Sequence, residues 1–287
     1  MEIIFIYIFI IFFPIYIGYL LIKFIYLKST LFMPKEYKII KKLVNRLATY
    51  NNLGDKEIIF SIGSGSYMMY RAKELGLCED EDTMFFRNLN PFIKSKNVKN
   101  IDINELNKQA YVFGGVDAYA WRRVVWISKS SFRSHKNHIN FLAWVLGHEI
   151  SHIIFNDHIM QSKKLLKEYK KIKNSDKQEL KKLLEMKLSR SSEKKADKNS
   201  AKMLINARFS KSKILEEFTY AAEIHGWEVD TDVEGTHPGY IERFKALKKF
   251  IRKYEVDIRS PINKNTWYWQ YNRNNNTLTY VPNNKQL

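Results

Sequence analysis

The feature that most constrains this chain is an apolar run that contains two histidines and a glutamate. Residues 141–155 read FLAWVLGHEISHIIF, a length and composition typical of a buried helix. Side chains four residues apart lie on one helix face, so His148 and His152 direct their ring nitrogens at one point. Glu149 projects beside that face, within reach of a water held at the same point. The pattern H-E-x-x-H therefore predicts a metal site, with zinc as the ion.

The alternative interpretation places the same side chains in the core as hydrogen-bonded residues without a metal. Burying two imidazoles and a carboxylate together in this way costs on the order of several kcal/mol of desolvation. The metal site is therefore favoured.

A zinc site of this kind needs a third protein ligand, and two residues compete for that role. His158 follows His148 by ten residues, but Phe155 stands where that spacing pattern requires a glycine turn. Glu193 and Asp197 are four apart in a helical pattern, so one can bind metal while the other supports a ligand imidazole. The pair could also be an ordinary solvated charge pattern among lysines.

Three motifs in order resemble the gluzincin membrane metallopeptidases typified by the CaaX prenyl protease and the bacterial heat-shock membrane protease. They are HEISH at 148–152, ExxAD at 193–197, and THP at 236–238 followed by Arg243, within a similarity that covers roughly residues 35–255. The resemblance implies one Zn²⁺ held by His148, His152 and Glu193, with Glu149 as general base and acid, Asp197 behind a ligand, and His237 and Arg243 facing the reacting carbonyl.

The resemblance also implies a zincin-like domain, mainly α with a small β-sheet. Residues 110–128 are expected to form a hairpin around Gly114–Gly115, with Trp121 and Trp126 in the core and contact with substrate as the alternative. In gluzincins a peptide substrate adds to the strand before the active-site helix. That strand is expected here to be Val124, Val125, Trp126, Ile127 and Ser128. Other expected elements are helices at 35–50 and 212–225, a strand at 57–62, and a hairpin at 267–281.

Residues 3–22 contain no charged side chain and are long enough to cross a ~30 Å hydrocarbon layer as a helix. A cleaved signal peptide is the rival, but Glu2 replaces the basic start that such peptides carry. Lysines after the span favour a cytoplasmic catalytic domain. The expected organisation is a membrane anchor at 1–28, a metallopeptidase domain at 29–257 and a hairpin tail at 258–287. Family members typified above span the membrane several times, so the prenyl-protease substrate class is not carried over.

The charge of the chain is strongly basic. Lys and Arg number 48 against 30 Asp and Glu, a formal net charge of +18. Such a charge favours an anionic phospholipid surface or nucleic acid, although lysine, asparagine and isoleucine are abundant throughout. The single cysteine excludes an internal disulfide.

The expected function is therefore a membrane-anchored zinc metalloendopeptidase that cleaves peptide or protein substrates in membrane or envelope protein quality control. Nucleic acid is the less expected partner. Two alternatives stay open. One is a membrane-bound protein without catalytic activity, whose metal-stabilised fold holds partners. The other is a basic adaptor that binds lipid or nucleic acid.

Overall fold

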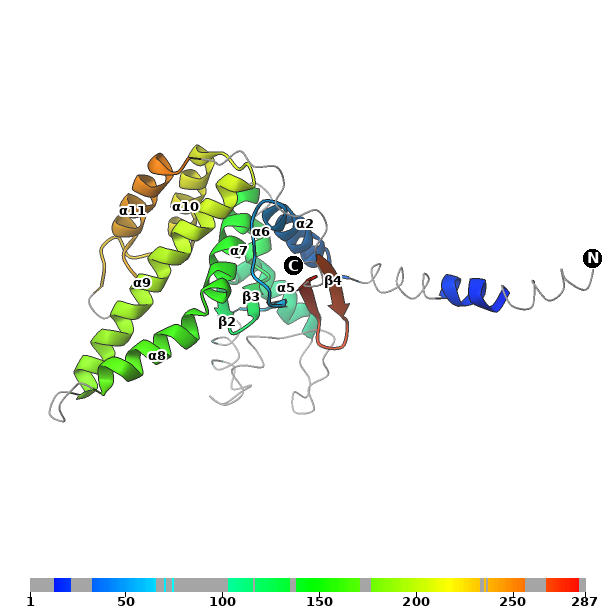
Figure 1. Ribbon diagram of the computed structural model, residues 1–287, viewed down its shortest axis with the longest axis horizontal. Coiled ribbons are helices and arrows are strands. Elements are labelled where there is room, and N and C mark those ends of the chain that lie inside the picture. Colours follow the sequence, from blue (N-terminus) through cyan, green and yellow to red (C-terminus); the bar gives the residue numbers. More distant parts are fainter. Residues whose placement is uncertain are drawn as a thin grey trace, which may run out of the picture.

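Helix α7 (Ile139–Ile154) is the centre of the computed structural model (Figure 1). It contacts α2, α9 and α10 as well as the strands β2 and β3. Almost every side chain of α7 is buried, which accounts for its apolar sequence on all sides. The structure describes residues 13–21, 33–65, 70, 74, 103–115, 117–134, 138–170, 177–232, 235, 237–255 and 267–283.

The described helices pack mainly against α7 and α9. Helix α9 (Lys177–Asn206) runs beside α7, and α8 (Asp157–Tyr169) lies along α9 (Figure 1). The remaining helices are α2 (Lys35–Tyr50), α5 (Ile103–Phe113), the single turn α6 (Ser131–Ser134), α10 (Lys211–His225) and α11 (Tyr240–Lys253). The mainly helical fold with a small sheet confirms the expected class.

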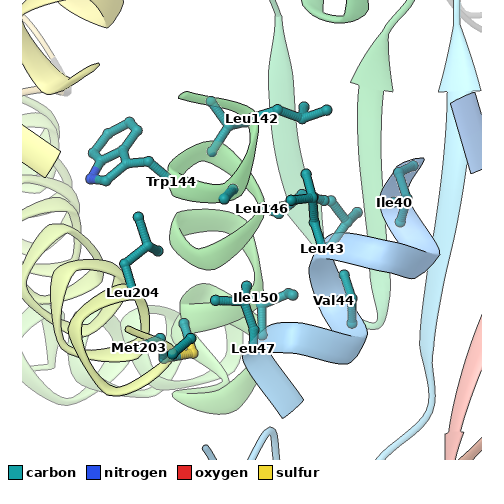
Figure 2. Close-up of a cluster of buried hydrophobic side chains, with 14 of the residues drawn as sticks. Ile40, Leu43, Val44, Leu47, Leu142, Trp144, Leu146, Ile150, Met203 and Leu204 are labelled. Atoms are coloured by element: carbon teal, nitrogen blue, oxygen red, sulfur yellow. The ribbon is translucent and has the colours of Figure 1, made fainter. Parts of the chain in front are cut away.

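The core is built by apolar residues at helical spacing. On α2, Ile40, Leu43, Val44 and Leu47 recur at intervals of one, three and four residues and are all buried. Figure 2 shows them facing apolar side chains of α7, with α9 on the far side of that helix. The labelled partners are Leu142, Trp144, Leu146 and Ile150 of α7 and Met203 and Leu204 of α9.

The sheet has the order β2-β3-β1-β5-β4. β1 (Ile58–Gly63) pairs in parallel with β3 (Val124–Ser128) and antiparallel with β5 (Thr277–Pro282). β2 (Ala118–Trp121) and β4 (Trp267–Asn272) are the two outer strands. The C-terminal hairpin β4–β5 thus extends the same sheet, and the indole nitrogens of Trp267 and Trp269 both donate to Asn45 Oδ1 of α2 at 2.8 Å.

Two expectations for residues 110–128 are wrong. Residues 110–113 end helix α5, and the hairpin turns instead at 122–123, where Arg122 has a positive φ of 54°. Consequently Val124, Val125, Trp126, Ile127 and Ser128 form an inner strand whose backbone is paired on both sides, so they cannot receive a substrate strand. A short β-rich run can end a helix as readily as it forms a strand, which explains the error.

The predicted span at 3–22 lies mostly outside the described residues. Its described part, 13–21, is helical. Among the residues that the structure describes, no helix combines the length and apolarity needed to cross a membrane.

Candidate metal centre and substrate groove

Three ligand atoms from two helices meet at the surface of α7. His148 Nε2 and His152 Nε2 lie 3.2 Å apart, as expected for residues one turn apart. Helix α9 brings Glu193 to the same point, with its carboxylate oxygens 3.3 Å from His148 Nε2 and 3.4 Å from His152 Nε2. The structure therefore joins the residues that the H-E-x-x-H and ExxAD motifs single out.

The spacing of these atoms fits zinc. Ligands ~2.1 Å from a tetrahedral ion lie ~3.4 Å from one another. The two imidazole nitrogens lie 3.2 Å apart, and each is contacted by a different oxygen of Glu193, Oε2 at 3.3 Å from His148 Nε2 and Oε1 at 3.4 Å from His152 Nε2, so the cluster is close enough to bind one metal ion. Two imidazole nitrogens and a carboxylate are also one of the donor sets found in catalytic zinc sites, where a fourth position is left for water or substrate.

Each ligand imidazole has a buried carboxylate behind it. His148 Nδ1 lies 3.0 Å from Asp197 Oδ1, and His152 Nδ1 lies 2.8 Å from Asp157 Oδ2. The His152–Asp157 contact is a hydrogen bond, which fixes the orientation of the ligand ring and increases its basicity, whereas the His148–Asp197 contact is an ion-pair distance without hydrogen-bond geometry. The ExxAD motif predicts Asp197 at this place behind a ligand imidazole, whereas no sequence motif predicts the same role for Asp157.

Asp157 reaches His152 because the chain turns between α7 and α8. Asn156 adopts the left-handed conformation, with φ 50° and ψ 41°, and Asp157 begins α8. On a continuous helix, a residue five positions on would face away from His152. The available sequence signal was Asn-Asp after an apolar helix, since asparagine favours the left-handed region and an acidic residue favours a helix start.

Arg243 lies behind the metal ligands. Its guanidinium donates two hydrogen bonds to Asp197, at 2.8 and 2.7 Å, and Nη2 lies 3.8 Å from Glu193 Oε2. The guanidinium carbon lies 4.0 Å from the ring centre of Trp227, and the side chain is only 3 % exposed. Arg243 thus holds the carboxylate that contacts His148, and its expected contact with the reacting carbonyl stays a prediction.

The electrostatics of the cluster favour positive charge. Burial lowers the pKa of both ligand imidazoles, but their carboxylate partners outweigh it and raise the pKa of His148 to about 9 and that of His152 to about 10. Burial likewise raises the pKa of the Glu193 carboxyl, yet the two imidazoles hold it well below its usual range. A site that stabilises protons on its ligands in this way also attracts a divalent cation.

Glu149 is buried beside the ligands, and the pKa of its carboxyl shifts in the opposite direction from that of Glu193. Only 7 % of the residue is exposed, and burial raises the pKa of its carboxyl above the usual value. A carboxyl whose pKa moves toward neutrality can both accept and return a proton.

Two cavities, of about 430 and 260 Å³, meet at the metal centre. Trp144 and Trp227 line the larger one, whereas Trp121 and His158 line the other. Both are bordered by the same residues at their junction, which are Ala118, His148, Glu149, Glu193 and His237. The two cavities therefore form one groove that passes over the ligand atoms.

The structure also shows where three other residues discussed from the sequence, His237, His158 and Trp121, lie relative to this groove. His237 lies at its rim, with Nε2 3.7 Å from Glu193 Oε1 and its side chain 64 % exposed. His158 contacts Trp121 in a tilted arrangement, with 5.1 Å between ring centres, and lies outside the ligand cluster, as the missing glycine indicated. Trp126 is buried in the core as expected, whereas Trp121 is 56 % exposed, so its expected place in the core is wrong. The outer strand beside the groove is β2, rather than Val124–Ser128.

Residues 92–251, more than half of the 287-residue chain, match the family model described as peptidase family M48. The chain belongs to peptidase family M48. This M48 chain is accordingly a zinc-dependent metallopeptidase, and its His-His-Glu cluster is close enough to bind the metal. No curated protein and no solved structure matches the M48 chain in the other two comparisons.

Proposed function

We propose that this M48 peptidase is an endopeptidase that cleaves a peptide bond in an extended segment lying along the groove. The supporting observation is that two cavities meet at the His-His-Glu cluster and extend from it past different residues, Trp144 and Trp227 in one and Trp121 and His158 in the other. A groove that continues past the ligands in both directions accommodates substrate on each side of the cleaved bond.

The outer strand Ala118–Trp121 is the segment to which we assign substrate binding. It borders the groove and pairs on one side with β3, and no described strand pairs with its other side. A peptide added there as a further strand receives backbone hydrogen bonds from β2, which hold it extended beside the metal centre.

In this proposal His148, His152 and Glu193 hold the zinc, which when bound acidifies water and polarises a carbonyl group. Glu149 accepts the proton of the attacking water and returns it to the departing amine. His237, at the rim, donates a hydrogen bond to the carbonyl oxygen as negative charge develops there. Asp197 and Asp157 keep the two ligand imidazoles oriented.

Glu149→Gln tests this assignment. The amide keeps the shape of the side chain but cannot take up a proton, so we expect zinc content to be unchanged and casein cleavage to fall by at least about 10²–10⁴-fold. Glu185→Gln is the matched control, since Glu185 lies on the exposed part of α9 with its side chain 51 % exposed. Full activity of Glu149→Gln would overturn the assignment.

We further propose that residues 3–22 anchor the enzyme in a membrane with the catalytic domain on the cytoplasmic side, where it acts in membrane or envelope protein quality control. The support is the uninterrupted apolar sequence and the lysines that follow it. Carbonate extraction of membranes from producing cells tests the anchor: the full chain should stay with the membranes, and a chain lacking residues 1–28 should not.

A further inference from the structure

The loop between α10 and α11 carries His237 to the groove, and its two ends are joined to each other. Tyr240 N donates to Glu228 O at 2.8 Å and Ile241 N to Val229 O at 3.2 Å. Thr231 adds a side-chain link, because it accepts a bond from Gly239 N at 2.9 Å and donates one to Glu242 at 2.7 Å. These contacts close the base of the loop, and Lys194 of α9 also donates to Glu242.

The part of the loop nearest to His237 is held by an arginine from another helix. Arg190 Nε and Nη2 donate to Gly235 O at 3.0 and 2.9 Å, and Nη2 also donates to Asp232 O. The planar guanidinium offers donors in a fixed geometry, so these bonds fix the direction of the loop as well as its distance. Gly235 precedes His237 by only two residues.

Arg190 stands one helical turn before the zinc ligand Glu193 on α9. The imidazole of His237 lies at the exposed rim, 3.7 Å from Glu193 Oε1, so the loop backbone sets how far it extends over the ligands. One rigid helix therefore carries the third metal ligand and also the side chain that sets the position of His237.

We propose that Arg190 is a positioning residue for the reaction, which sets the distance of His237 from the metal centre. The inference rests on the proposed role of His237 as a donor to the carbonyl oxygen. A misplacement of about 1 Å at such a donor lowers turnover by up to about 10²-fold, because the hydrogen bond matters most in the transition state.

The test measures casein cleavage by the zinc-loaded full chain. We expect Arg190→Ala to lower kcat about 10–100-fold, with KM within about threefold and zinc content unchanged. Arg190→Lys should recover part of kcat, since an ammonium group can still reach one carbonyl. Lys187→Ala removes the same charge from an exposed position of the same helix and should leave kcat unchanged.

The decisive comparison adds Arg190→Ala to a chain that already carries His237→Ala. If Arg190 acts through His237, the double variant is as active as His237→Ala alone. An equal further loss in that background would show a separate structural effect and overturn the proposal. So would full activity of His237→Ala, which would leave the peptidase assignment intact because that assignment is tested by Glu149→Gln.

Discussion

At Gly147, helices α7 and α9 approach so closely that a methyl group does not fit. A Cβ atom there would lie 2.7 Å from Ser200 Oγ, whereas its distances to Leu204 and Met203, 3.4 and 3.5 Å, are ordinary contacts. The serine hydroxyl is itself engaged, since it donates to Trp144 O at 2.8 Å. Gly147→Ala must therefore displace this hydroxyl or move the two helices apart.

Three contributions set the change in the free energy of unfolding for Gly147→Ala. Alanine is more favourable than glycine inside a helix by about 1 kcal/mol. Against this, losing the Ser200 hydrogen bond costs about 1 kcal/mol, and crowding a packed interface costs about 1–3 kcal/mol. We therefore expect Gly147→Ala to destabilise the fold by about 1–3 kcal/mol.

The sign should reverse when the crowding atom is removed first. Ser200→Ala deletes the hydroxyl oxygen and its bond to Trp144, so the only large contribution left to Gly147→Ala is the helical preference of alanine. In that background we expect Gly147→Ala to stabilise the protein by up to about 1 kcal/mol. Urea unfolding of the two single variants and the double variant, followed by circular dichroism, measures all three changes.

Zinc affinity is a second test of the close packing between α7 and α9 at Gly147. His148 lies on α7 and Glu193 on α9, so helices forced apart would separate two ligands of one ion. Zinc should bind more weakly to Gly147→Ala than to the original chain, and the double variant should recover its affinity. Equal destabilisation by Gly147→Ala in both backgrounds would refute this explanation.

Two further predictions concern the carboxylates behind the ligand imidazoles. Asp157→Ala should lower zinc affinity about 10–100-fold, because His152 loses the partner that orients it; Asp157→Asn should lower it less, and competition with a chromophoric chelator measures both. Arg243→Met should destabilise the fold by about 3–5 kcal/mol in urea unfolding, because Asp197 is left buried without its main cation. A loss below about 1 kcal/mol would show that this ion pair contributes little net stability.

Much of the metal centre follows from local sequence. The spacing of His148 and His152 suffices to bring their ring nitrogens together, because a helix has a fixed period. The same period places Glu193 and Asp197 on one face of α9, and composition identifies α7 as buried. These predictions needed only the order of residues along single helices.

Contacts between distant segments could not be predicted in this way. Arg190 binds backbone carbonyl groups, which every residue carries, so no sequence signal marks its partners. The sequence predicts Val124–Ser128 as the edge strand, but the edge is Ala118–Trp121. Strand order depends on pairing between distant parts of the chain, which local sequence does not show.

The sequence by itself determined which side chains could bind zinc and move a proton, since helical spacing is a short-range property. Only the tertiary structure decided what surrounds them. The turn at Asn156 brings Asp157 to His152, and the packing at Gly147 sets how near α9 comes to α7. Both depend on how whole helices cross and turn, which local spacing leaves open.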